Sequence, residues 1–336
     1  MDNRVRLLSV AGALPPTVRT SEEVEDLVAA GSPAVRVRRG TVGAMTGIRT
    51  RRVAADGVQC SDLAAAAARD ALAKASLGVR DVDVLIFAAA GQDLTEPATA
   101  HIVQQKLGTR CQVFDVKNAC NSFLNGVQLA ESLILSGSCR VALVTTGEVC
   151  SRAINWAARD EEELRRNFPG YTMGDAGAAA VLARSDDGSG IFYRAFASLS
   201  EFWELATIPG GGTMHPRGDE FTFLRGDGAR LKQTFVELGP RIFCRMMHDA
   251  GVSWDDFDRI FVHQVSLPYH REMLAASGMP ADKVERTVEC YGNMASASIP
   301  VAFALAEARG TVRRGDRVMW LGMASGISVG VLMIDV

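Results

Sequence analysis

Three side chains of this sequence stand where residues of their type often do chemistry, and the first is a cysteine. Cys120 follows a predicted strand around 113–116 and precedes a stretch of helical spacing from Phe123 to Gly137. The start of a helix offers unsatisfied N–H groups and a positive dipole end, which favour a thiolate. Because the thiolate is the nucleophilic form, the pattern predicts a nucleophile at Cys120. The other reading is a small, inert, buried side chain.

A histidine and an asparagine supply the other two groups. His263 ends the apolar run 260–262, and open α/β sheets place ligand clefts beside such strand ends. Asn293 precedes a small-residue turn and a helix start. A satisfied core histidine and an ordinary capping loop are the other readings. Together the three groups suit thioester chemistry, in which the thiol takes an acyl group and two N–H donors hold an enolate oxygen.

The elements that must position these residues recur in one order along the chain. Helical and strand patterns alternate in both halves, and each half closes with a small-residue segment. The first half has helices over 61–77, 97–107 and 123–137, strands over 84–88, 113–116 and 141–144, and the closing segment 173–182. The second has helices over 232–250, 269–277 and 298–309, strands over 260–262 and 318–321, and the closing segment 325–332. The order predicts a duplication, although any α/β chain alternates helix and strand.

Composition bounds the class of protein. The 336 residues are 48% hydrophobic and 22% charged, with a formal net charge of −3, which is typical of a globular chain. The near-neutral balance gives no general attraction to nucleic acid or to an anionic membrane. No apolar run approaches the roughly 20 residues of a membrane span, and residues 1–14 lack a signal-peptide layout. We therefore expect no membrane span and a cytoplasmic location.

The seven cysteines predict neither a disulfide framework nor a metal site. They are odd in number and scattered, and none forms a Cys-x-x-Cys pair. No metal and no cofactor is expected.

Taken in order, the motifs resemble the thiolase superfamily, specifically the ketoacyl synthase III-like condensing enzymes. The likeness runs from about residue 44 to the C-terminus and weakens between about 185 and 225. It rests on Thr46-Gly47-Ile48 with the arginines that follow, Asn118-Ala119-Cys120, Met173-Gly174-Asp175-Ala176-Gly177-Ala178, His263-Gln264 and Tyr291-Gly292-Asn293.

The resemblance implies an α/β thiolase fold. Two similar βαβαβαββ halves would form a five-layered αβαβα sandwich, and members of the family are usually homodimers. Residues 1–184 would be the half with the nucleophilic cysteine, and residues 185–336 the half with the histidine and the asparagine.

The resemblance also implies roles for the site residues. Cys120 would be acylated from an acyl-CoA or acyl-carrier-protein thioester, and His263 and Asn293 would act on the second thioester. The backbone N–H groups of Cys120 and Ser325 would form the acyl oxyanion hole. The C-terminal loop at 322–326 lacks the second catalytic cysteine of degradative and biosynthetic thiolases, which disfavours reversible thiolysis.

Departures from the family pattern are informative. Pro268 stands where ketoacyl synthases III carry an arginine that helps to hold the carrier protein, which leaves that docking open, with Arg271 nearby as a substitute. Within residues 150–225, Trp156, Phe202 and Trp203 are candidate pocket walls, although aromatic residues are more often core.

Glu96 is the sharpest departure. Housekeeping synthases carry a phenylalanine here that reaches across the dimer. The glutamate is similar to that of the olefin-biosynthesis thiolases, which join two acyl thioesters head to head with a base from the neighbouring subunit. The resemblance thus implies that Glu96 of the partner subunit removes an α-proton. The other reading is an acidic residue in the first turn of a helix beginning at Pro97.

The leading hypothesis is an acyl-thioester condensing enzyme of the acyltransferase class, similar to olefin-biosynthesis and natural-product ketosynthase III-like enzymes. It would load Cys120 and then carry out Claisen condensation in fatty acid or polyketide biosynthesis. Three alternatives stay open: a decarboxylative ketosynthase that uses a malonyl-type extender, an acyltransferase that forms an ester or amide, and a non-catalytic partner subunit. Acyl-chain length and pathway are not predicted.

Overall fold

Five strands from the first half of the chain form one mixed β-sheet. The computed structural model describes residues 4–336. The strand order is β1-β7-β6-β4-β5, in which β5, β4 and β6 are parallel and β7 is antiparallel to both β6 and β1. The strands are β1 (Val5–Ala13), β4 (Val84–Ala88), β5 (Gln112–Val116), β6 (Val141–Glu148) and β7 (Ala176–Arg184). The apolar run predicted at 84–88 is β4, and all five of its residues are buried, as expected of a central parallel strand.

Four strands from the second half form another sheet, in the order β11-β12-β13-β8. These are β8 (Gly190–Ser198), β11 (Arg259–Val262), β12 (Arg317–Ala324) and β13 (Ser328–Asp335). Where the first sheet has the edge strand β5, this sheet has only an isolated parallel bridge between Ile260 and Val284. Two hydrogen bonds make it: the Ile260 N–H donates to the Lys283 carbonyl, and the Glu285 N–H donates to the Ile260 carbonyl. The counterpart of β5 in the second half is thus reduced to one bridge.

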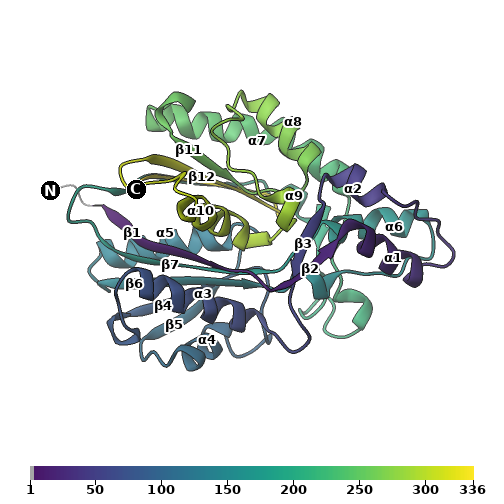
Figure 1. Cartoon of the computed structure of the whole chain (residues 1–336), viewed down its shortest axis with the longest axis horizontal. Helices are drawn as coiled ribbons and strands as arrows, with labels where there is room; N and C mark the ends of the chain where they lie inside the picture. The colour runs from purple at the N-terminus through teal and green to yellow at the C-terminus, as the bar shows by residue number, and fades with distance from the viewer. Residues whose placement is uncertain (1–3) are drawn as a thin grey trace.

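Helices lie outside and between the two sheets and complete five layers, αβαβα (Figure 1). The helices α3 (Cys60–Lys74) and α4 (Thr99–Leu107) cover the outer face of the first sheet. The helices α5 (Ser122–Leu135) and α10 (Ser298–Ala308) lie between the sheets, and α7 (Gly228–Ala250) and α8 (Leu267–Ser277) cover the second sheet. The predicted helices all form, although the one expected from Pro97 begins at Thr99.

Small residues let α3 approach the first sheet closely. The helix is rich in alanine, and the strands beneath it carry glycine at Gly147 and Gly177. A Cβ added at Gly147 would lie 1.8 Å from the Cys60 carbonyl oxygen, and one at Gly177 would lie 2.3 Å from that of Leu63. Any larger residue at either position would push the helix away from the sheet.

Aromatic side chains fill the layer between the two sheets. Phe123 of α5 and Phe303 of α10 both pack on Trp320 of β12, with ring centroids 6.2 Å and 5.4 Å apart. Phe261 of β11 packs on Phe303 at 5.3 Å. Since this core draws on both halves, each half stabilises the other. The sheets divide the chain between residues 184 and 190, and the boundary at 184/185 stays a prediction.

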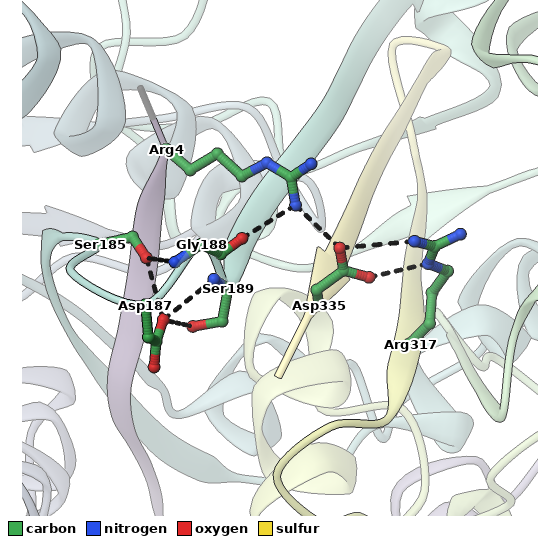
Figure 2. Close-up of polar contacts among 7 residues, drawn as sticks. All are labelled: Arg4, Ser185, Asp187, Gly188, Ser189, Arg317 and Asp335. Atoms are coloured by element: carbon green, nitrogen blue, oxygen red, sulfur yellow. Dashed lines mark hydrogen bonds and ion pairs between the residues drawn. The ribbon is translucent and has the colours of Figure 1, made fainter. Parts of the chain in front are cut away.

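Polar contacts tie the two halves together at the end of the sheets that is remote from the caps described next. Figure 2 shows Asp335 between Arg4 at the start of β1 and Arg317 at the start of β12, with N–O distances of 2.8 and 2.7 Å. The turn before β8 is fixed by Asp187, whose carboxylate accepts from the Ser189 N–H and hydroxyl.

Shorter elements cap the other end of the sandwich (Figure 1). They are the strands β2 (Thr17–Thr20), β3 (Thr50–Val53), β9 (Ala206–Thr207) and β10 (Arg225–Gly226), and the helices α1 (Ser21–Gly31), α2 (Thr41–Thr46), α6 (Glu161–Asn167) and α9 (Val288–Tyr291). The described residues also include short 3₁₀ helices: η1 (Val79–Asp81), η2 (Cys150–Ala153), η3 (Phe168–Thr172), η4 (Ser200–Leu205), η5 (Asp219–Phe221), η6 (Trp254–Asp256) and η7 (Ala295–Ala297). Within residues 4–336, no helix is long and apolar enough to cross a membrane.

Candidate active site

Cys120 lies in a tight turn between β5 and α5, at the helix N-terminus that the sequence predicts. The hydroxyl of Ser122 fixes this turn, because it accepts from the Asn118 N–H at 2.8 Å and donates to the Ala119 carbonyl at 2.7 Å. Ala119 adopts a left-handed backbone with φ of 46°, which few residues with a side chain adopt without a surrounding constraint. These contacts therefore hold the turn that carries Cys120 in one conformation.

The thiol of Cys120 is protonated at neutral pH. Burial raises the pKa of Cys120 to about 12, and the nearby carboxylate of Glu148 adds to the rise. A helix N-terminus stabilises an anion by at most about 2 kcal/mol, near 1.5 pH units. Full burial of an ionisable group can shift its pKa by 3–5 units. Burial therefore outweighs the helix dipole, and the resting site holds a thiol where the helix position alone predicts a thiolate.

His263 follows β11 and is 3% exposed. Its backbone N–H donates to the Leu321 carbonyl of β12 at 3.0 Å. Burial lowers the pKa of His263 to about 4, so the imidazole is neutral. Its Nδ1 atom is buried and has no hydrogen-bond partner among the described residues, so His263 is not a satisfied core histidine. A neutral imidazole with an unused nitrogen can take up or donate a proton.

Gln264 fixes the loop behind His263. Its amide nitrogen donates to the Glu285 carbonyl at 2.7 Å, and its oxygen accepts from the N–H groups of Thr287 and Val288 at 3.1 Å each. All three partners belong to the segment that leads to Asn293. Gln264 therefore joins the two loops of the second half that carry the imidazole and the carboxamide.

Asn293 is 4% exposed and is held by its backbone. Its N–H donates to the Thr172 carbonyl at 2.8 Å, and its carbonyl accepts from the Gly174 N–H at 2.9 Å. Its side-chain oxygen accepts from the Ala295 N–H at 3.0 Å. Because the oxygen is used within the turn, the side-chain N–H groups are the part of Asn293 left to donate elsewhere, as the predicted role requires.

Contacts at the end of β12 bring the loops of Cys120 and His263 together. A Cβ at Gly322 would lie 1.9 Å from the Asn121 side-chain oxygen, so the residue after Cys120 touches β12 directly beside Leu321, the partner of His263. The Asn121 amide also donates to the Ser328 hydroxyl at 2.9 Å.

Asn293 reaches the same region through Ser296, whose hydroxyl donates to Glu148. That carboxylate is close enough to raise the pKa of the Cys120 thiol. The three predicted residues therefore belong to one cluster of loops.

Ser325 lies in the turn between β12 and β13 and is half-buried. Within the described chain its N–H donates to no carbonyl, so it remains available as an oxyanion-hole donor. The role of the Ser325 and Cys120 N–H groups stays a prediction.

Glu96 is exposed on the loop between β4 and α4. It makes no hydrogen bond or ion pair with any residue of 4–336, so its own chain does not bring it to Cys120. The reading of Glu96 as a first-turn helix residue is wrong, because α4 begins at Thr99. Asp93 anchors the same loop by accepting from the Ser61 N–H and hydroxyl.

Two buried groups near the thiol were missed from the sequence. Glu148 ends β6 and is fully buried, and the only signal for it is a carboxylate directly after a run of apolar and small residues. Tyr269 of α8 is 5% exposed, and its hydroxyl lies 3.4 Å from the Met323 sulfur. The proximity of Cys120 contributes to the raised pKa of Tyr269. In the chain from residue 4 onward, no group of three metal-ligating side chains gathers.

A cavity of about 460 Å³ lies apart from this cluster, beside the loop 203–215. Trp203, one of the predicted pocket walls, lines it together with Ile208 and Met214. Trp156 instead stacks on Tyr171, with ring centroids 6.1 Å apart.

Comparison with known proteins identifies relatives of both halves. Family models for 3-oxoacyl-[acyl-carrier-protein (ACP)] synthase III match residues 114–198, and those for its C-terminal part match residues 247–336. The beta-ketoacyl-[acyl-carrier-protein] synthase III of Neisseria gonorrhoeae is 32% identical over 88% of this chain and 89% of its own length. That of Syntrophomonas wolfei is 28% identical over 98% and 97%.

Solved structures of Xanthomonas campestris OleA have a similar fold. One, of a cysteine-to-serine variant with bound lauric acid and lauroyl-CoA, superposes with a TM-score of 0.90, 28% identity and full coverage of both chains. Others are of variants in which one histidine or one glutamate of that protein is replaced. The match confirms the thiolase fold expected from the sequence.

Proposed function

The chain belongs to the 3-oxoacyl-[acyl-carrier-protein] synthase III family, and from this membership we propose that it joins two acyl thioesters by Claisen condensation, with Cys120 as the nucleophile. The donor is an acyl-CoA or an acyl-carrier-protein thioester, as in the family. Arg271 is exposed on α8, beside Pro268 in the first turn of that helix, and is the residue that we propose for contact with a carrier protein.

In the first half-reaction, the Cys120 sulfur attacks the carbonyl carbon of the donor thioester. The new S–C bond forms as the thiol proton passes to the neutral imidazole of His263. The N–H groups of Cys120 and Ser325 hold the oxyanion. When the bond to the leaving thiol breaks, His263 returns its proton to that thiol. The step starts from a neutral thiol and a neutral imidazole. This agrees with the raised pKa of Cys120 and the lowered pKa of His263.

In the second half-reaction, Glu96 of the partner subunit removes an α-proton from the second acyl thioester. The enolate oxygen accepts hydrogen bonds from His263 and Asn293, and its α-carbon attacks the acyl carbon on Cys120. A C–C bond forms, the S–C bond to Cys120 breaks, and the departing thiolate takes up the proton that Glu96 removed, which restores the Glu96 carboxylate. The product is a β-keto thioester.

One observation favours condensation over simple acyl transfer. Asn293 uses its side-chain oxygen within its own turn and keeps its N–H groups for another partner, on the loop that Gln264 ties to His263. An acyltransferase that makes an ester or amide forms no enolate and needs no such pair of donors.

A homodimer is part of this proposal, because Glu96 acts from the partner. The edge strand β5 supports it, since one side of β5 pairs with β4 and the other pairs with no strand of the described chain. Gln112 of β5 is exposed, whereas the Asp115 carboxylate accepts from the Thr99 and Ala100 N–H groups at the start of α4. An unpaired edge is a ready site for strand pairing with a second copy. Light scattering in solution tests the assembly.

Product analysis tests the function. The enzyme is incubated either with two plain acyl-CoA esters or with an acyl-CoA and carboxyl-labelled malonyl-CoA. We expect a β-keto product from plain acyl chains with no malonyl thioester present. Glu96→Gln should lower its formation at least tenfold, whereas Glu201→Gln, at an exposed glutamate of η4, should not. Product only with malonyl-CoA and labelled CO₂ would establish the decarboxylative reaction instead, and an ester or amide would refute condensation.

A further inference from the structure

Glu148 is a buried carboxylate that the proposed mechanism does not use. It ends β6, beside the Cys120 turn, and its side chain accepts hydrogen bonds from three separate segments. A charged group is costly to bury unless hydrogen-bond donors surround it. The donors gathered around Glu148 therefore need an explanation.

The first segment is the loop that carries Glu96. Glu148 accepts from the Ala90 N–H at 2.7 Å and from the Gly91 N–H at 2.9 Å, one bond to each carboxylate oxygen. A Cβ at Gly91 would lie 2.9 Å from the Cys60 sulfur and 3.1 Å from the Glu148 carboxylate, so this approach requires glycine. Glu148 therefore fixes the start of the loop that presents Glu96.

The second segment is the turn after Asn293. The Ser296 hydroxyl donates to Glu148 and lies 2.6 Å from the Thr146 hydroxyl. Ser296 is next to Ala295, whose N–H binds the Asn293 side-chain oxygen. Ala295 has a φ of 45°, a backbone that surrounding contacts must hold in place. The link from Glu148 through Ser296 is one such contact.

The third segment holds Cys150, whose sulfur lies 3.9 Å from a Glu148 oxygen. Titratable groups near the carboxylate come from several elements: Cys60 of α3, Cys120 before α5, and Cys150 and Asp175 from the segments after β6 and before β7. Burial raises the pKa values of the Cys60, Cys120 and Cys150 thiols, and the proximity of Glu148 adds to the rise. Burial also raises the pKa of Glu148 itself, against the hydrogen bonds that stabilise its charged form.

We propose that Glu148 is a positioning residue for the condensation: it holds the Asn293 turn and the Glu96 loop in fixed relation to Cys120. It does not touch the reacting atoms. Its carboxylate acts through Ser296 on the carboxamide and through Ala90 and Gly91 on the loop of the base. In its ionised form the carboxylate adds to the effect of burial, which is the main reason that the Cys120 thiol is protonated. This inference rests on the proposed function for its kinetic part only.

Two variants separate the parts of this role. Ser296→Ala removes the link to Asn293 and keeps the carboxylate, whereas Glu148→Gln removes the charge together with one of the two oxygens that accept from Ala90 and Gly91. Glu131→Gln is the matched control, because Glu131 is also a buried glutamate but lies far along α5 and pairs with Arg194. Circular dichroism and thermal unfolding show which variants fold.

The kinetic readout compares acylation of Cys120 with condensation. Ser296→Ala is expected to lower condensation about tenfold more than acylation, because only the second step uses Asn293. The chemical readout is alkylation of Cys120 by iodoacetamide. Burial raises the pKa of Glu148, so its charge acts most fully at high pH, and Glu148→Gln is expected to raise the alkylation rate about tenfold at pH 9, because loss of a nearby negative charge favours the thiolate. A purely structural role would not move that profile in a folded variant.

The outcomes are distinct. The inference fails if wild type condenses acyl chains while Ser296→Ala lowers both steps equally and the Glu148→Gln alkylation profile superimposes on that of Glu131→Gln. If Glu148→Gln does not fold, Ser296→Ala still decides the kinetic part. If the wild-type enzyme forms no condensation product, the proposed function is refuted. The alkylation rates of Cys120 then still test whether the Glu148 charge affects the thiol.

Discussion

The protonation state of Cys120 gives a prediction whose size follows from the structure. Burial raises the pKa of Cys120 to about 12. At pH 8 the thiolate is then about 10⁻⁴ of the population, whereas an ordinary cysteine of pKa about 8.5 is about one quarter ionised. Since the thiolate is the form that reacts, alkylation of Cys120 should be about a thousandfold slower in the folded enzyme than in the unfolded chain.

The assay is iodoacetamide labelling followed by peptide mass spectrometry, from pH 7 to pH 10. The rate at Cys120 should rise about tenfold per pH unit over the whole range, with no plateau. Restricted access lowers the absolute rate but leaves this slope unchanged, so the slope isolates the ionisation. Cys290, which is exposed, reports reagent activity in the same digest. A plateau at Cys120 between pH 7 and pH 9 would refute the argument, because it would mean a thiolate in the resting site.

Three further predictions concern the stability of the fold and the turn that carries Cys120. Because burial raises the pKa of Glu131 to about 7, the folded chain keeps a proton that the unfolded chain loses, so its contribution to the free energy of unfolding falls by about 3 kcal/mol from pH 4.5 to pH 7. Urea unfolding at pH 5 and pH 8 should show Glu131→Gln gaining stability relative to wild type as pH rises, and an equal difference at both would contradict this. Gly322→Ala should cost about 1–3 kcal/mol and slow acylation, since its Cβ meets Asn121 at 1.9 Å, whereas Gly239→Ala, whose nearest neighbour is at 3.7 Å, should do neither. Asp335→Asn, which weakens one arginine contact between the two sheets and one within the second sheet, should lower the melting temperature by a few degrees, and an unchanged value by calorimetry would show that the network adds nothing.

Much of the fold could be predicted from local sequence, because the buried strands and Ala-rich helices carry strong patterns. The run at 84–88 has the same limits in the structure as in the sequence. The missing strand of the second half could not be foreseen, since a single bridge at Val284 has no pattern of its own. The start of α4 was misplaced because Pro97 favours a first helical turn, whereas Asp93 and its contacts hold the segment as a loop.

The sequence predicted where the candidate site residues lie in the fold but not their electrostatics, and their catalytic roles stay predictions. Cys120, His263 and Asn293 stand beside recognisable strand and helix ends, so their positions follow from the chain order. The charge state of Cys120 depends on burial by elements distant in sequence, including Glu148, and no local pattern carries that information. The same holds for Asn293, whose free donors depend on a bond to Ala295 in the folded turn.

Peptide mapping after incubation with a panel of acyl-CoA esters tests the central claim most directly. The account predicts an added mass equal to the acyl group on the peptide that contains Cys120, its release by hydroxylamine, and its loss together with condensation in Cys120→Ala. An acyl group carried by Cys60 or Cys150 instead, or undiminished condensation by Cys120→Ala, would contradict it.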